Sequence, residues 1–169
     1  MTQTMVTTQV HRVYIKATPQ AVWDAITKPD WTERYGYGAR EEYDLRPGGA
    51  YRALPGQAMK DGGAERGFPI PDVLVDGEVV EADPPRKLVQ TWRLLMDPEV
   101  AAEGFTRLTY EIQQTADGVT RLTVVHDVEG APKLAVLLAG EREDEGAGGG
   151  WPWVLSGLKS LLETGTSLQ

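Results

Sequence analysis

Residues 151–165 read WPWVLSGLKSLLETG, and this stretch carries an apolar pattern of helical spacing. The pattern predicts a C-terminal helix over about 151–163 with one strongly apolar face. Strand signals precede it at about 73–82, 86–96, 105–115 and 119–127, and turn residues separate them as in an antiparallel meander. A single helix after many strands favours a curved antiparallel sheet that grips this helix on its concave face. The apolar positions of the helix are Trp151, Val154, Leu155, Leu158, Leu161 and Leu162.

The beginning of the chain predicts one strand, two short helices and a hairpin. Residues 10–17, VHRVYIKA, alternate as an opening strand does. Thr18 and the proline after it are a helix N-cap followed by proline at the first helical position, so a helix is expected over about 19–27. A further helical turn is expected over 30–35. Residues 41–54 then form two short strands around the turn sequence RPGG.

These elements define an α+β fold with six to seven antiparallel strands around a long C-terminal helix and two short helices after the first strand. We expect a flexible N-terminus over 1–9, one domain over 10–163 and a C-terminal tail over 164–169. Two long connections have no sustained apolar period. They are 55–72, rich in glycine and proline, and 128–150, and both are expected to border a pocket mouth. The first is expected to be mobile or to form a lid, and residues 140–150 of the second are expected to be mobile.

Composition excludes several classes of function. The 169 residues include 17 basic and 25 acidic side chains, a formal charge of −8, which disfavours binding to nucleic acid. No apolar run approaches the roughly 20 residues of a membrane span. The chain has no cysteine and only two histidines, so we predict no metal site and no cofactor. A cytoplasmic location and a monomeric or homodimeric state are expected.

Period two in the predicted strands assigns side chains to the two faces of the sheet. One face carries Trp92 and Leu94, Tyr110, and His126, and this face is expected to point toward the final helix. The other face is polar, which marks it as the solvent side. Its members are Arg93, Thr106, Arg107, Thr109, Glu111, Arg121 and Thr123.

Five motifs together resemble the START-like, helix-grip superfamily, in the branch named for the activator of heat shock protein 90 ATPase. They are TPQAVWDAIT (18–27), DLRPGGAYR (44–52), GEVVEADPPRKLVQTW (77–92), TRLTVVHD (120–127) and GGGWPWVLSGLKSLLE (148–163). The resemblance spans about 10–162. It implies the helix-grip fold, and among similar proteins are co-chaperone-like proteins, small-molecule and lipid binders, polyketide cyclases or aromatases, and antibiotic self-resistance proteins.

The favoured function is non-catalytic binding of a hydrophobic or aromatic small molecule between the sheet and the last helix. A cyclase- or aromatase-like enzyme using the same cavity is one alternative, and a co-chaperone-like or sequestering protein is another. Aromatic side chains supply apolar surface, and tyrosine and histidine supply polar anchors. The candidate ligand-binding residues are Trp31, Tyr51, Trp92, Leu94, Tyr110, His126, Trp153 and Leu155.

His126 has two interpretations. It can bond a ligand or act as a general base. It can equally be a structural histidine with partners on a neighbouring strand, and this second interpretation is favoured. Trp92 is open between pocket wall and core, and Trp153 lies off the apolar stripe of its helix, at the expected pocket entrance.

Overall fold

The computed structural model describes residues 7–67, 70–146 and 148–168. Within them the strands form one antiparallel sheet of seven strands in the order β1-β7-β6-β5-β4-β3-β2. The predicted fold class is therefore confirmed, and the meander of four strands lies where the turn signals placed it. The strands are β1 Thr8–Ile15, β2 Arg40–Tyr43, β3 Ala50–Leu54, β4 Val75–Asp83, β5 Lys87–Leu94, β6 Thr106–Ala116 and β7 Val119–Asp127.

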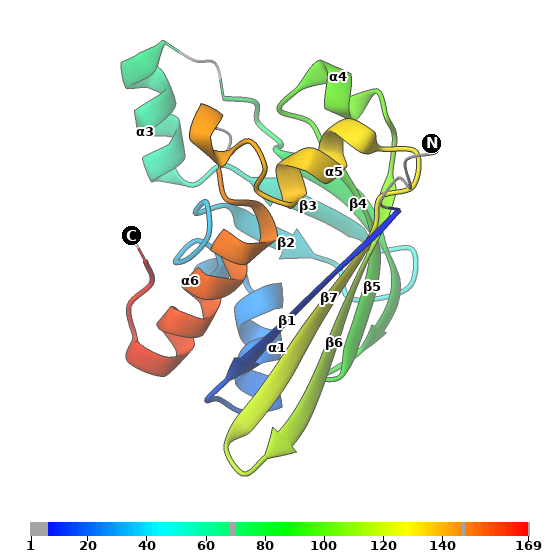
Figure 1. Ribbon diagram of the computed structural model, residues 1–169, viewed down its shortest axis with the longest axis vertical. Helices are drawn as coiled ribbons and strands as arrows, with labels where there is room; N and C mark the ends of the chain where they lie inside the picture. The colour runs from blue at the N-terminus through cyan, green and yellow to red at the C-terminus, as the bar shows by residue number, and fades with distance from the viewer. Residues whose placement is uncertain (1–6, 68–69, 147, 169) are drawn as a thin grey trace, which may run out of the picture.

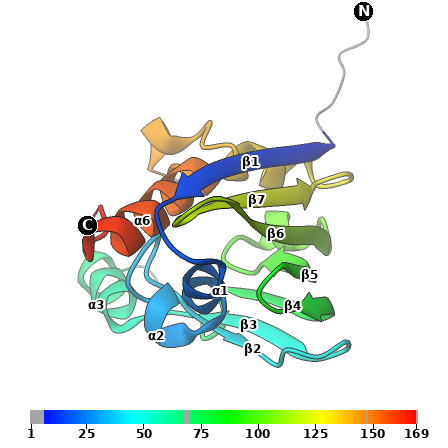
Figure 2. The ribbon, with the colours of Figure 1, turned by 90° about the horizontal axis from the view of Figure 1, so that it is seen from below.

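The helices gather on the concave side of the sheet, and the last of them runs beside β1 and packs on the first helix (Figures 1 and 2). The two short helices expected after the first strand are confirmed. The helical elements of the described residues are α1 Pro19–Thr27, α2 Pro29–Thr32, α3 Gln57–Arg66, α4 Pro98–Ala101, α5 Pro132–Leu138, the single-turn η1 Glu143–Glu145, and α6 Gly150–Thr164.

Helix α1 begins with the N-cap and the proline that the sequence predicted. The hydroxyl oxygen of Thr18 accepts a hydrogen bond from the backbone N–H of Ala21 at 3.1 Å. Pro19 occupies the first helical position, where no intrahelical N–H bond is lost. The first strand begins at Thr8 and ends at Ile15, two residues earlier than the alternation suggested. Residues 1–6 of the expected flexible terminus lie outside the described residues, and the division into domains stays a prediction.

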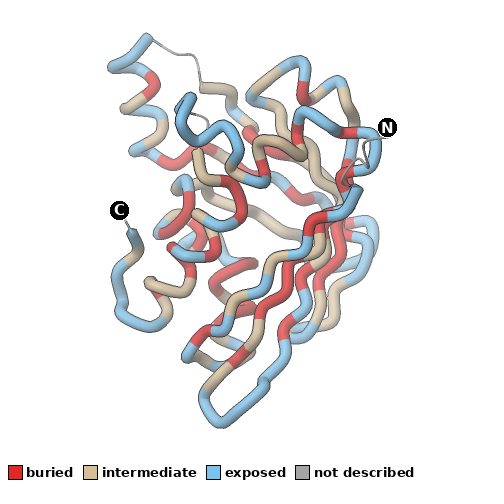
Figure 3. The backbone as a smooth tube through the Cα atoms, in the orientation of Figure 1, coloured by how far each residue is buried: buried red, intermediate tan, exposed pale blue. Residues whose placement is uncertain are grey.

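The core lies between the concave face and the helices, and Figure 3 shows buried positions recurring along the strands and on one side of α6. Leu158 of α6 is 1% exposed, and Leu108 and Leu122 of the sheet are fully buried. Gly157 of α6 faces the loop after α2, where a Cβ at this position would lie 3.4 Å from the backbone nitrogen of Gly36. The sequence pattern of 151–165 thus defines the core side of α6.

The two long connections contain helices that the sequence pattern did not predict, and their mobility stays a prediction. Residues 55–72 contain α3, and residues 128–150 contain α5 and η1. Helix α3 has no apolar stripe and buries only Gly63, so hydrophobic periodicity could not reveal it. It ends at Gly67, whose φ of 72° is the left-handed conformation of a helix C-cap.

We still expect α3 and residues 141–146 to exchange amide hydrogens far faster than β5, β6 and β7. Helix α3 contains the adjacent glycines Gly62 and Gly63, which weaken a helix by about 1 kcal/mol each relative to alanine. Few apolar contacts hold either segment, so local opening costs little free energy. Hydrogen exchange followed by mass spectrometry measures this difference. Protection of α3 equal to that of the central strands contradicts it.

Candidate functional site

His126 lies at the centre of a buried hydrogen-bond chain that joins α6 to the sheet. The indole N–H of Trp151 donates to His126 Nδ1 at 3.2 Å, and His126 Nε2 lies 2.7 Å from the hydroxyl of Thr106. Thr106 in turn donates to the carbonyl of Trp92 at 3.0 Å. Because an indole only donates, Nδ1 must be the acceptor, which assigns the proton of the neutral ring to Nε2.

Burial lowers the pKa of His126 to about 4, although Asp127 opposes the shift. The ring is therefore neutral at physiological pH, and both nitrogens already have partners inside the protein. This geometry matches the structural interpretation of His126. A ligand could bond to the ring only by displacing Trp151 or Thr106.

Thr106 is the residue that the face assignment misplaced. It is 6% exposed and points inward, whereas the sequence pattern put it on the solvent side. Its register partner is Trp92, and Leu108 two residues further pairs with His126, so all of them share the concave face. Alternate residues of a strand share a face, so Thr106, two residues before the inward-facing Leu108, is expected on the concave face.

A second polar group lies on the concave face, toward the other edge of the sheet. The hydroxyl of Tyr51 donates to Glu41 Oε1 at 2.7 Å, and the hydroxyl of Tyr43 donates to Gln90 Oε1 at 2.7 Å. The rings of Tyr43 and Tyr51 lie 4.7 Å apart between centroids. We call Glu41, Tyr43, Tyr51 and Gln90 the inner polar cluster. Of these four residues only Tyr51 is a candidate predicted from the sequence, which missed Glu41, Tyr43 and Gln90 as site residues.

The register explains how the inner polar cluster forms. Tyr43 pairs with Tyr51, and Glu41 pairs with Ala53, so alternate residues of β2 and β3 point to the same face. Gln90 pairs with Val79, a core residue of β4. The pattern REEY at 40–43 therefore carries a signal, because period two places its first glutamate on the face of the tyrosine.

Glu41 carries the most perturbed carboxyl group of the site. The residue belongs to an edge strand and is partly exposed as a whole, but its carboxyl group accepts a bond from Tyr51, which is 1% exposed. Burial raises the pKa of Glu41 to about 7, and the bond from Tyr51 only partly offsets this. Burial also raises the pKa values of Tyr43, Tyr51 and Tyr110 well above their usual range, so these hydroxyls stay protonated.

Gln90 has an unused hydrogen-bond donor. Its side chain is fully buried, and its amide oxygen accepts from Tyr43. Its amide nitrogen Nε2 has no hydrogen-bond partner, and among the described residues it is the one buried side-chain polar atom in this condition. A buried donor without a partner lowers the stability of the fold by about 1–3 kcal/mol, and most buried polar atoms in proteins are paired.

The structure brings together five of the eight candidate residues around this region. Tyr51 belongs to a small apolar cluster against which Trp92 and Leu94 pack. The ring of Trp92 meets that of His126 edge to face at 5.3 Å, and Tyr110 meets Trp151 in the same way at 6.1 Å. Most of these side chains are in contact with the core, so the concave face is lined by aromatic rings.

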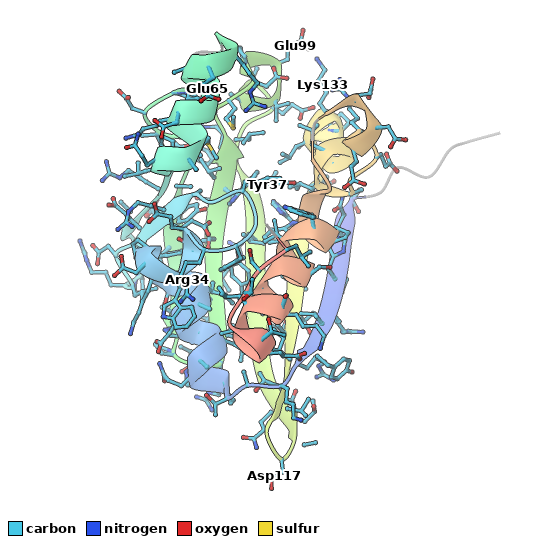
Figure 4. The ribbon with its side chains drawn as sticks, turned by 90° about the vertical axis from the view of Figure 1, so that its left-hand side faces the viewer. Arg34, Tyr37, Glu65, Glu99, Asp117 and Lys133 are labelled. Atoms are coloured by element: carbon cyan, nitrogen blue, oxygen red, sulfur yellow. The ribbon has the colours of Figure 1, made fainter. Side chains whose placement is uncertain are left out.

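The other three candidates lie apart from the inner polar cluster. Trp31 is partly buried beneath the guanidinium of Arg34, which lies 4.8 Å from the ring centroid (Figure 4). Trp153 donates its indole N–H to the carbonyl of Gly36 at 3.2 Å, on the loop that also carries Tyr37 (Figure 4). Leu155 is 5% exposed and belongs to the core side of α6.

Neither a membrane span nor a metal cluster is found in the part of the chain that the structure describes. None of its helices is long and apolar enough to cross a bilayer. The described residues also contain no group of three or more histidine, cysteine or acidic side chains placed to hold a metal ion.

A curved antiparallel sheet that closes on a C-terminal helix, with an aromatic and partly polar interior, defines the class of helix-grip proteins. The comparison with protein families is consistent with this class. The family described as activator of Hsp90 ATPase homolog 1-like protein matches residues 16–163, and the chain belongs to this family.

Solved structures share the fold at low sequence identity. A protein from Bordetella parapertussis is 21% identical, with a TM-score of 0.65, over 99% of this chain and 80% of its own. DynU16, a putative protein in the dynemicin biosynthetic locus, is 19% identical with a TM-score of 0.63, over 96% of this chain and 49% of its own. An HSP90 activator from Plasmodium falciparum is 19% identical with a TM-score of 0.53, over 72% of this chain and 73% of its own. Among curated proteins, none matches the chain.

Proposed function

We propose that the protein binds a small aromatic molecule that presents a hydrogen-bond acceptor, such as a carbonyl group, to Gln90 on the concave face of the sheet. The observation that carries the proposal is the unpartnered Nε2 of this fully buried amide. An acceptor of the ligand would complete the hydrogen bonding of Gln90, whose oxygen is already held by Tyr43. The binding would be non-catalytic.

The surroundings of Gln90 suit an aromatic ligand. Tyr43, Tyr51 and Tyr110 contribute aromatic rings with protonated hydroxyls, of which the first two already donate to Gln90 and Glu41, and Trp92 adds an apolar face that is only partly buried. Burying about 200 Å² of ligand surface at roughly 25 cal/mol per Å² contributes about 5 kcal/mol before the costs of association. Tight binding therefore depends on polar groups that hold the ligand. The amide nitrogen of Gln90 can donate to a ligand without breaking a hydrogen bond inside the protein.

A covering segment gives such a ligand a route of entry. Met59 of α3 and Ile70 after it pack on the cluster of Tyr51 and Trp92. Helix α3 is held by few apolar contacts. We infer that displacement of α3 exposes this end of the interior at low cost in free energy.

An acid–base enzyme acting on the same kind of ligand is a second candidate, and Glu41 favours it. A carboxyl group with a pKa of about 7 is populated in both protonation states at neutral pH, as a general acid or base requires. Tyr51 fixes one carboxylate oxygen and leaves the other available. This function would also need substrate to reach Glu41 beside the tyrosine rings.

A matched pair of ligands tests the proposed anchor. We expect anthraquinone sulfonate, which carries carbonyl acceptors, to bind more tightly than anthracene sulfonate, which has none, when each is titrated by calorimetry. Gln90→Leu should weaken anthraquinone binding about tenfold, the value of one hydrogen bond to a buried donor, and leave anthracene binding unchanged. Gln114→Leu, at an exposed position, is the control. Equal affinity of the two ligands, or no effect of Gln90→Leu, contradicts the proposal.

A further inference from the structure

Among the described residues, strand β1 forms a free edge of the sheet, as Figure 2 shows, and pairs only with β7. Its backbone groups alternate between the partner and the outside. The carbonyl of Thr7 accepts from Val128, which fixes the odd-numbered residues as those bonded to β7. The carbonyl of Tyr14 points the other way, where it accepts from the side chain of Lys159 at 2.6 Å. Thr8, Val10 and Arg12 therefore direct their N–H and C=O groups outward.

Helix α6 closes one end of this edge and leaves the other end open. Beside the bond from Lys159, Glu163 accepts the backbone N–H of Lys16 at 2.8 Å. Within the described residues the outward backbone groups of Thr8, Val10 and Arg12 have no such partner. An edge with unpaired backbone groups over three alternate residues is a template for a further strand.

Two open grooves lie along this free stretch. One, of about 620 Å³, lies between β1 and α6, and the other, of about 470 Å³, lies between β1 and α5. They share Val10 and His11, so together they border the edge from Thr8 to Val13. Gln9 holds α5 against the strand through a bond to the carbonyl of Ala135 at 2.8 Å. The walls of the grooves opposite β1 include the small residues Ser156, Ser160, Ala135 and Ala139.

The side chains on the solvent face of the edge have an alternating character. Val10 and Tyr14 are 53% and 51% exposed, and Arg12 between them is exposed and forms no ion pair within the described residues. Residues directly opposite in paired strands share a face. A strand added beside β1 would therefore fit best with a carboxylate opposite Arg12 and apolar residues two positions before and after it. Arg12 is thus a cation on the open stretch of the edge whose charge a carboxylate on an added strand could neutralise.

We propose that the β1 edge binds an extended acidic segment of a partner protein as an additional strand, with a carboxylate side chain opposite Arg12. The partner's backbone completes the bonds of Thr8, Val10 and Arg12. Its inward-facing side chains enter the grooves beside α5 and α6, where the small wall residues leave room for them. A second copy of this chain is the competing occupant. Antiparallel self-pairing centred on Arg12 would place two guanidinium groups opposite each other, which disfavours that arrangement.

The test uses two capped heptapeptides, TVTETVT and TVTKTVT, labelled for fluorescence anisotropy with the full chain. We expect saturable binding of the glutamate peptide and at least about tenfold weaker binding of the lysine peptide. Arg12→Glu should reverse this preference. Arg107→Glu, an exposed position within β6, should change neither affinity by more than about twofold. Amide exchange at Thr8, Val10 and Arg12 should slow when the glutamate peptide is bound.

Val10→Pro supplies a backbone test, because it removes an outward N–H that β7 does not use, and it should abolish binding. Should this variant fail to fold, the charge reversal at Arg12 decides by itself. Absence of saturable binding by either peptide overturns the proposal, as does equal weakening by Arg107→Glu. Slow exchange at the same three amides without peptide, together with a dimer in sedimentation, shows instead that a second copy occupies the edge.

Discussion

Replacement of Leu158 by aspartate is expected to remove most of the stability of the fold. Leu158 is 1% exposed and packs in the core between α6 and the sheet. Loss of a buried leucine side chain alone costs about 2–5 kcal/mol, and a carboxylate without a partner at the same place adds to this. Because a domain is stabilised by only about 5–15 kcal/mol, we expect the melting temperature to fall by at least about 10 °C.

Ser156→Asp is the matched control for this variant. It introduces the same charge on the same helix at an exposed position, where substitutions usually change stability by less than about 0.5 kcal/mol. Thermal unfolding followed by circular dichroism compares the two variants with the parent. A Leu158→Asp protein that melts within a degree or two of the parent would show that α6 does not fill the concave face.

The sequence pattern was sufficient for the elements that bury one face. Strands β4 to β7 alternate apolar and polar residues, and α6 repeats apolar residues at helical spacing, so each has a single consistent solution against a common core. The inward direction of Trp92, Tyr110 and His126 followed from the same alternation. The structure places all three on the concave face.

Hydrophobic periodicity gave no correct prediction where the buried residues do not recur with the period of a helix or a strand. Helix α3 buries a glycine and little else, so it has no stripe to detect. Glu41 is a charged residue in a short edge strand beside a hairpin, which is the composition of a solvated turn. Period two puts Glu41 on the face of Tyr43, but the bond that holds its carboxyl group comes from Tyr51 on β3, and a contact across strands is not visible in one strand alone. The unpartnered nitrogen of Gln90 likewise depends on three-dimensional neighbours.

Glu41 of the inner polar cluster and His126 together make a quantitative prediction about pH, because these two buried groups have opposite effects on stability. Glu41 has a pKa of about 7 in the folded protein against an ordinary value of 4.5. Between these values the folded state holds a proton that the unfolded state has lost, so stability falls as pH rises. His126 has a folded pKa of about 4 against 6.5. Between these values the unfolded state holds the extra proton, so stability rises with pH.

Over the shared window from about pH 4.5 to 6.5 each group contributes a slope of about 1.4 kcal/mol per pH unit, and the slopes cancel. The parent is therefore expected to show little pH dependence from this pair. Glu41→Gln should leave the slope of His126 alone, so this variant loses about 3 kcal/mol, relative to the parent, when pH falls across the window. His126→Asn should show the reverse slope on a lower overall stability.

Glu42→Gln is the control for this experiment, because Glu42 lies on the opposite face of β2, where its side chain is 44% exposed and paired with Arg52. Urea unfolding at half-unit pH intervals gives the four stability curves. Parallel curves for Glu41→Gln and the parent would show that the Glu41 carboxyl is solvated in the folded protein, and the acid–base candidate would lose its support. Opposite slopes in the two single variants, with a flat parent, require both groups to be buried and neutral. The interior that a ligand meets near neutral pH then holds hydrogen-bond donors beside aromatic rings, and a carboxyl group that gains its charge only as pH rises through about 7.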